Sequence, residues 1–124
     1  MRTQQNARLC QGDDRTLMIA VSNPSNLNLT GLQAKYIAAA ASVGPNTPII
    51  TKTVGSGITI ITDPASVPVD YALVLKVVLV NDDTDDVPPG WYYHEAQVTL
   101  ANASTITVMT GQLRVDPSWT NSRL

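Results

Sequence analysis

The chain has 124 residues, of which eight are Lys or Arg and ten are Asp or Glu, so its formal net charge at pH 7 is −2. This length suits one domain and is too short for two. The basic residues are spread from Arg2 to Arg123 without a cluster along the sequence. Because phosphate backbones are bound by clustered positive charge, nucleic acid is not expected as a partner.

Cysteine usage and the apolar segments bear on the compartment. The single cysteine, Cys10, cannot form a disulfide within the chain, so the fold must depend on core packing, as suits a reducing compartment. Residues 1–14 lack the apolar segment and the cleavage site of a secretory signal peptide. The most apolar run, residues 71–80, is interrupted by Lys76 and is far shorter than the ~20 residues that a membrane helix needs. We therefore expect neither a signal peptide nor a membrane partner.

Strand signals recur at short intervals and are separated by Gly, Pro, Asn and Asp, which is typical of an all-β domain. The expected strands, in chain order, are residues 15–21, 32–38, 47–53, 57–62, 70–80, 91–100 and 104–115. The third and fourth of them are joined through a Gly-Ser-Gly turn, either as a hairpin or as one kinked strand. Only the alanine run 38–41 favours a helix, and Gly44 and Pro45 follow it too closely for one to form.

The spacing and type of these segments predict an all-β fold, an immunoglobulin-like antiparallel β-sandwich of about seven strands over residues 12–117. Residues 1–11 are expected to form a flexible N-terminal segment, and residues 118–124 a C-terminal tail without periodicity. Gly111 interrupts the last strand, and we expect a β-bulge there.

An unusual aromatic cluster opens the strand at residues 91–100, and the two-residue period of a strand divides it. Tyr92 and His94 share a face with Ala96, Val98 and Leu100, which we take as the core face. Pro89 and Gly90 supply the preceding turn, so a buried Tyr92 with its hydroxyl bonded to nearby backbone would fix the corner. His94 on this face is expected to be a neutral, hydrogen-bonded packing residue, since no other ligand accompanies it at metal-binding spacing.

Trp91 and Tyr93 fall on the opposite, outward face of the same strand. The core of the domain does not account for large rings in that position, so they either cover a loop or meet a partner. We therefore predict that Trp91 and Tyr93 form a protein contact, while Pro89, Gly90, Tyr92 and His94 form a structural corner.

Motifs for catalysis and cofactor binding are absent from the sequence. It contains no G-x-S-x-G, no H-E-x-x-H and no phosphate-binding Gly-rich motif, and a single His and a single Glu leave little for acid–base catalysis. As a calcium loop beginning at Asp82, the acidic turn would place Val87 and Tyr93 where Gly and Glu are required. We expect no enzyme, no cofactor and no metal; an enzyme would need Cys10 or His94 exposed in a pocket.

Four short motifs follow one another in a characteristic order: Gly12-Asp13 before the first strand, Leu29-Thr30-Gly31 before the second, Pro89-Gly90-x-Tyr92 after an acidic turn, and Gly111-x-Leu113-x-Val115 near the end. In this order the chain resembles the immunoglobulin-like domains of tailed-phage structural proteins, of the kind found at the N-terminus of baseplate upper proteins and tail fibres. The resemblance covers residues 12–117. The chain departs from that pattern in its alanine run, and no fibre or receptor-binding segment is expected after Leu124.

The resemblance implies a non-enzymatic structural or assembly module of a tailed-phage or prophage virion, at the tail, the baseplate or a fibre attachment. Such a module would be made in the bacterial cytoplasm and would act through contacts with other virion proteins or with further copies of itself as a homo-oligomer. The alternative is a β-sandwich module that binds carbohydrate through its outward aromatics. Carbohydrate binding predicts a concave aromatic surface, whereas protein contact predicts a flat apolar one.

Overall fold

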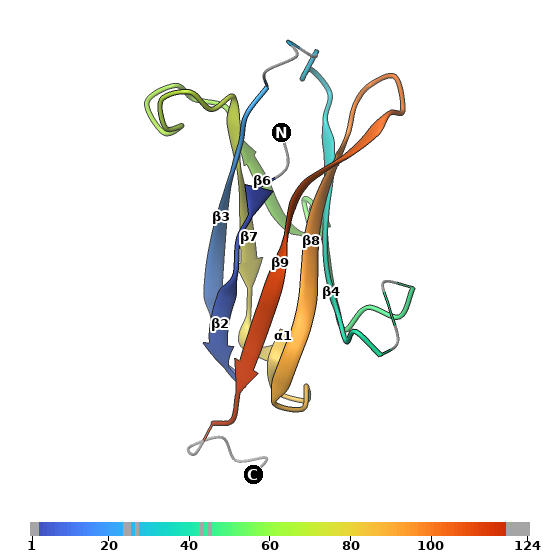
Figure 1. Cartoon of the computed structure of the whole chain (residues 1–124). Helices are drawn as coiled ribbons and strands as arrows, with labels where there is room; N and C mark the ends of the chain where they lie inside the picture. The colour runs from blue at the N-terminus through green and yellow to red at the C-terminus, as the bar shows by residue number, and fades with distance from the viewer. Residues whose placement is uncertain (1–2, 24–25, 27, 43, 45, 119–124) are drawn as a thin grey trace.

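The computed structural model describes residues 3–23, 26, 28–42, 44 and 46–118 (Figure 1). The described chain is all-β, with one four-residue helix, α1 (Asn81–Thr84). Its strands are β1 (Thr3–Gln4), β2 (Ala7–Cys10), β3 (Arg15–Val21), β4 (Gln33–Ala39), β5 (Ile50–Val54), β6 (Gly57–Ile61), β7 (Leu73–Leu79), β8 (Gly90–Thr99) and β9 (Thr105–Asp116). The strand expected at 15–21 is found with those bounds, and the other six expected segments each overlap a strand.

The nine strands form one mixed sheet in the order β1–β9–β8–β4–β5–β6–β7–β3, and β2 also pairs with β9. Most neighbours are antiparallel, including the long β8–β9 hairpin and the β3–β7 pair. The strands β1 and β2 run parallel to β9. The expectation of a purely antiparallel arrangement is therefore wrong at this edge of the sheet.

The chain changes its pairing partner between β5 and β6. The strand β5 pairs with β4, whereas β6 pairs with β7. Between them, the backbones of Thr53 and Ser56 bond to each other. Where β5 and β6 meet, they pair in parallel, with Thr53 opposite Gly57. The segment is thus a kinked strand rather than a hairpin, and it carries the sheet from one side of the molecule to the other.

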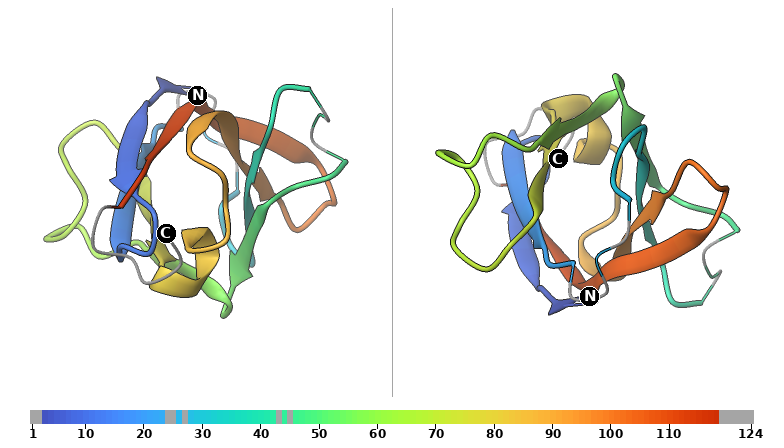
Figure 2. Two further views of the ribbon diagram at one scale, coloured as in Figure 1. Left: turned by 90° about the horizontal axis from the view of Figure 1, so that it is seen from below. Right: turned by 90° about the horizontal axis from the view of Figure 1, so that it is seen from above.

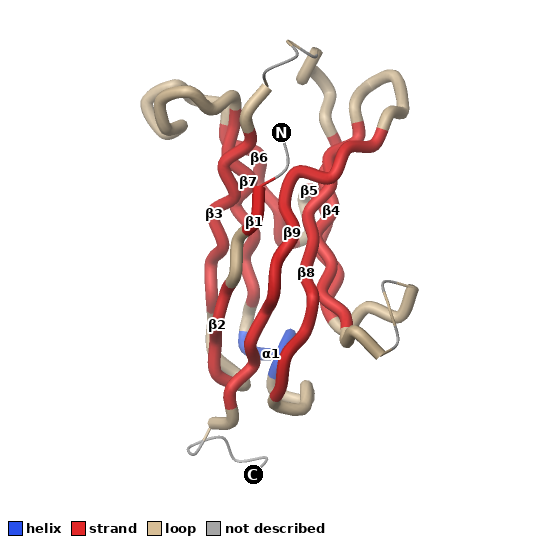
Figure 3. The backbone as a smooth tube through the Cα atoms, in the orientation of Figure 1, coloured by secondary structure: helices blue, strands red, loops and turns tan. Residues whose placement is uncertain are grey.

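The sheet curls around a single hydrophobic core, and the end views in Figure 2 show the strands surrounding it. Alternate residues of most strands are buried, and the largest fully buried side chains include Tyr36, Ile19, Leu75, Leu79, Met109 and Leu113. The curl brings the two edges of the sheet together, since the Gln5 side-chain amide donates to the carbonyl oxygen of Met18 at 3.3 Å. Figure 3 shows β1 and β2 lying between β9 and β3.

The N-terminal residues are ordered strand where a flexible segment over 1–11 was expected. The register of β2 pairs Ala7 to Cys10 with Leu113 to Asp116, and Leu9 is buried in the core. The following turn is also fixed, because the Gln11 amide donates to the carbonyl oxygen of Val87 at 2.7 Å. Residues 3–11 therefore belong to the domain; the short segments and single buried leucine left too weak a period to indicate strands.

The bulge predicted at Gly111 lies elsewhere. Along the β8–β9 hairpin the register shifts between Ala96, which faces Met109, and Gln97, which faces Thr107. The extra residue on β9 is thus Val108, while Gly111 remains in register with His94. The glycine has a different structural reason, which involves the N-terminal strand, by which we mean β1, β2 and the two residues that link them, Gln5 and Asn6.

Candidate functional site

The aromatic cluster at the start of β8 divides between the core and the surface as its alternation predicts. Tyr92 is 8% exposed and His94 is 2% exposed, whereas Trp91 and Tyr93 are 60% and 57% exposed. The next core-face residues, Ala96 and Val98, are also buried. Inward and outward side chains of this short segment therefore belong to two different environments.

Tyr92 lies at the turn that leads into β8. Its hydroxyl donates a hydrogen bond to the carbonyl oxygen of Pro88 at 2.5 Å, four residues earlier in the chain. Gly90 has φ +155°, a conformation that side chains rarely adopt, so the turn requires glycine there. Burial raises the pKa of the Tyr92 hydroxyl, which keeps it protonated as a donor. The turn and the start of the strand are thus joined by one side-chain bond.

His94 is hydrogen-bonded through both ring nitrogens. Its Nε2 lies 2.7 Å from the carbonyl oxygen of Gln5, and its Nδ1 lies 2.9 Å from the hydroxyl of Tyr36. A carbonyl oxygen can only accept, so Nε2 carries the proton and the Tyr36 hydroxyl donates to Nδ1. Burial lowers the pKa of His94, against the opposing effect of its bond to Gln5. The ring is therefore neutral and links the core to the N-terminal strand.

Gly111 makes room for that same strand. A Cβ atom at this position would collide with the carbonyl oxygen of Gln5, and Gly111, unlike the other six glycines, does not have a positive φ. The backbone of Gln5 also donates to the carbonyl oxygen of Thr110 at 2.9 Å, and Asn6 Oδ1 accepts from the backbone of Gln112 at 3.0 Å. Space, not backbone conformation, thus explains the glycine, and the sequence offered no sign of this contact.

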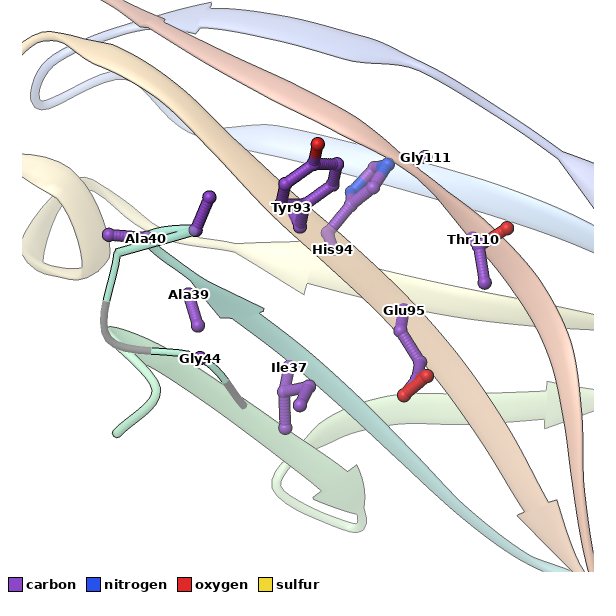
Figure 4. Close-up of a pocket in the computed structure, with 10 residues that line it drawn as sticks. Ile37, Ala39, Ala40, Gly44, Tyr93, His94, Glu95, Thr110 and Gly111 are labelled. Atoms are coloured by element: carbon purple, nitrogen blue, oxygen red, sulfur yellow. The ribbon is translucent and has the colours of Figure 1, made fainter. Parts of the chain in front are cut away.

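A hollow of about 320 Å³ lies beside Tyr93 on the outer face, between β4 and β8. Figure 4 shows its labelled residues on β4, β8 and β9 and in the turn after β4; they include Ile37, Ala39, Ala40, Tyr93, Glu95 and Thr110. The hollow is mostly apolar because the alanine run places small side chains opposite a large ring: Ala39 faces Tyr93 in the register. The alanines that fit no strand preference thus create space on the surface.

Trp91 borders a second hollow, of about 340 Å³, on the same outer face. It is lined by three arginines and two amides: Arg8, Arg15, Arg114, Asn6 and Gln112. These side chains come from β2, β3, β9 and the chain before β2, so only the folded sheet brings them together. Composition suggested scattered basic residues, and sequence reasoning missed this cluster because the parallel pairing of β2 with β9 carries no local signal.

The guanidinium of Arg114 is fixed from two sides. Its Cζ lies 5.3 Å from the ring centroid of Trp91, and its Nε donates to Asp116 at 3.2 Å. The same carboxylate accepts two bonds from Arg8, at 2.6 and 3.2 Å. These bonds, from Arg8 above all, lower the pKa of Asp116, so the carboxylate stays ionised.

The other residues considered for chemistry lie apart. Cys10 faces Asp116 on β9, and His94 faces Gly111 on the same strand. Asp116 and Gly111 are five residues apart, which is about 16 Å at 3.3 Å per residue, so Cys10 and His94 are too far apart to act together. In the acidic turn, Asp83 accepts from the backbone of Val80 at 2.7 Å and from Lys52 at 2.8 Å. Within the described residues, no three His, Cys, Asp or Glu side chains are grouped so as to hold a metal ion.

Across the described ranges, no helix is long and apolar enough to cross a membrane.

No family model and no curated protein matches the chain. Among solved structures, the chain is similar to a 2,6-sialyltransferase from Vibrionaceae Photobacterium sp. JT-ISH-224, in a ternary complex with CMP and lactose, at 10% sequence identity and a TM-score of 0.35. The match covers 94% of this chain and 18% of that chain. A likeness at this level carries no argument about what the present chain does.

Proposed function

We propose that the chain is a non-enzymatic structural module of a tailed-phage or prophage virion that assembles through protein contacts on the outer face of β8. The observation that carries the proposal is the exposure of two large rings, Trp91 at 60% and Tyr93 at 57%, on one strand of a compact sheet. Aromatic side chains commonly dominate the energy of protein interfaces. The resemblance of residues 12–117 to phage domains supplies the biological setting.

An immunoglobulin-like sandwich is the finer fold that we propose. Three features support it: the parallel pairing of β2 with β9, the kink that passes the chain between β5 and β6, and the bond from the Tyr92 hydroxyl to the carbonyl oxygen of Pro88. A buried tyrosine bonded to backbone a few residues upstream is a known corner device of such domains.

The Tyr93 side of the face is hollowed rather than flat, and its apolar lining is the feature that suits a protein partner. Its hollow is mostly apolar and is lined by small alanine side chains, with Glu95 as the one carboxylate in its lining, so an apolar partner side chain could fill the part between the alanines and Tyr93. Filling a preformed apolar hollow removes water from both Tyr93 and the inserted group, which favours association.

A paired substitution tests the assembly role. We expect Trp91→Ser with Tyr93→Ser to keep the melting temperature within about 2 °C, because exposed rings contribute little to the monomer, and to abolish association. Light scattering measures the mass of each protein, and thermal melts measure stability. If the wild type is a monomer, the partner must be another virion protein. Association is then measured by co-purification with the structural proteins that are encoded by neighbouring genes, in place of the mass.

The matched control is Val69→Ser with Tyr71→Ser, which removes two exposed apolar side chains from the loop before β7. This control should associate as the wild type does. The proposal is wrong if the Trp91/Tyr93 variant unfolds, which would make the rings part of the core, or if it keeps wild-type association.

Carbohydrate binding is the second candidate, and one observation favours it. Trp91 borders a hollow that contains polar side chains, whereas a surface used only for protein contact is expected to be flat and apolar. Binding sites for small ligands are concave and combine apolar contact with a few directed polar groups. The two outward rings therefore need not share one task.

A further inference from the structure

The geometry points to the hollow beside Trp91 as a binding site for an acidic sugar residue, one whose carboxylate meets the arginines while its ring lies on the indole. This inference deepens the carbohydrate-binding candidate and is independent of the assembly role at Tyr93. The site consists of Trp91, Arg8, Arg15, Arg114 and Gln112, which line one hollow of about 340 Å³.

The charge in the hollow favours an anion. Among the described residues, Asp116 is the only carboxylate that pairs with its arginines, and it bonds Arg8 and Arg114 but not Arg15. Three guanidinium groups thus share a single negative charge, in a chain whose net charge is −2. An added carboxylate would balance part of this excess, whereas a neutral ligand would leave it unchanged.

Suitable donors remain free and are held in place. Arg114 uses only Nε in its bond to Asp116, so its two terminal nitrogens have no bond within the described part of the chain. Arg15 likewise has no ion pair among the described residues and is exposed at the start of β3. Because Asp116 and Trp91 already fix Arg114, binding a carboxylate there costs little further ordering.

The indole supplies the second half of the recognition. Arg114 and Trp91 face each other in the register, and the arginine is the more buried of the two, with 28% of its side chain exposed against 60% for the Trp91 residue. With the guanidinium against one side, the exposed side of the indole offers a flat apolar surface next to the arginines. The apolar face of a sugar ring fits such a surface, and the Gln112 amide lies near enough to the same hollow to meet its hydroxyls.

A sugar fits these features better than an acidic peptide segment. The hollow is local, and the polar groups in its lining are side-chain groups, three guanidinium groups and two amides beside the indole, rather than a row of backbone donors and acceptors. An extended peptide gains much of its affinity from backbone bonds to a free strand edge. A single ring with a carboxylate needs only the indole, the guanidinium groups and an amide.

The test is a titration of the full chain at low ionic strength, in which the backbone amide and indole N–H signals are monitored by NMR. The probe is the disaccharide of glucuronic acid linked β-1,4 to glucose, and cellobiose is its neutral match. We expect the acidic probe to bind about tenfold more tightly than cellobiose, as one charge-assisted hydrogen-bonded contact provides. The shifts should centre on Trp91, Arg114 and Gln112.

Variants then assign the contacts. Arg15→Gln and Trp91→Ser should each weaken the acidic probe by about tenfold, whereas Lys76→Gln, an exposed cation on β7, should not change it. Tyr93→Ser should leave sugar binding intact even where it abolishes assembly, so that the two proposals fail separately. The NMR spectrum itself shows whether each variant is folded.

Several results would overturn the inference. Equal affinity for the acidic disaccharide and cellobiose would remove the role of the arginines, and shifts confined to the Tyr93 hollow would place the ligand elsewhere. Binding of tetraglutamate at Trp91 and Arg114 without binding of either sugar would make the site one for acidic peptide. No shift with any of the three probes would mean that the hollow is not a ligand site.

Discussion

The inward and outward halves of residues 91–94 differ in how their polar atoms are used. On the core side, the Tyr92 hydroxyl and the His94 Nε2 each donate to a backbone carbonyl oxygen, and His94 Nδ1 accepts from Tyr36. On the outer side, Trp91 and Tyr93 stand more than half exposed. The inner pair thus ties together a turn and the N-terminal strand, while the outer pair is available to a partner.

This difference separates scaffold from site more reliably than the crowding of aromatics does. A buried polar group whose bonds are all made within the chain stabilises the fold and has nothing left to offer a ligand. The outer face instead carries guanidinium nitrogens without partners among the described residues, beside an exposed ring. Free donors next to an apolar surface are what a binding site requires.

The contact between Gly111 and the N-terminal strand offers the strongest way to break the inner half. Gly111→Ala should lower the free energy of unfolding by about 2–3 kcal/mol, because the new methyl group meets the carbonyl oxygen of Gln5 and must displace the strand that His94 holds. Urea melts measure the change.

Truncation supplies the control. In a chain lacking residues 1–6 the obstructing carbonyl is gone, so Gly111→Ala should then cost no more than about 0.5 kcal/mol. If the substitution costs the same with and without these residues, the close approach of Gln5 is not what requires glycine.

Much of the fold could be predicted because its signals are local. The β-branched and alternating segments gave β3 with its bounds and placed the core face of β8 correctly, down to the burial of Tyr92 and His94. The segment 1–11 could not be predicted, because β1 and β2 are two and four residues long and their pairing with β9 joins residues more than a hundred positions apart. Long-range pairing of short strands leaves almost no periodic pattern.

The candidate site was predicted only in part, and for the same reason. The outward position of Trp91 and Tyr93 follows from strand alternation within one segment. The arginines around Trp91 come from three strands, and the alanines beside Tyr93 come from the end of β4 and the turn after it, so the two hollows exist only in the folded sheet. The sequence therefore indicated the rings but not what surrounds them.

The hydroxyl of Tyr92 gives a smaller and sharper test of the same comparison. Tyr92→Phe should lower the free energy of unfolding by about 1 kcal/mol through loss of its bond to Pro88. Tyr93→Phe also removes a phenolic hydroxyl, but on the outer face, where that hydroxyl makes no bond within the described chain. This substitution should leave the free energy of unfolding unchanged. Equal midpoints for the two variants in urea would show that the corner bond contributes nothing.

The smallest expected effect is a dependence of stability on pH that comes from His94 alone. Burial lowers the pKa of the folded histidine below its usual value, so on acidification the unfolded chain takes up the proton first. Stability from this group is thus complete above the unfolded pKa of about 6.5 and falls as the pH drops from there toward the folded pKa. Because only one proton is involved, the loss of stability between pH 7 and 6 is less than about 1 kcal/mol.

The variant His94→Gln cannot titrate, so the slope of its stability against pH in this range should be flatter than that of the wild type, whatever its absolute stability. Equal slopes, measured by urea melts at several pH values, would mean that the ring is not held neutral between Tyr36 and Gln5.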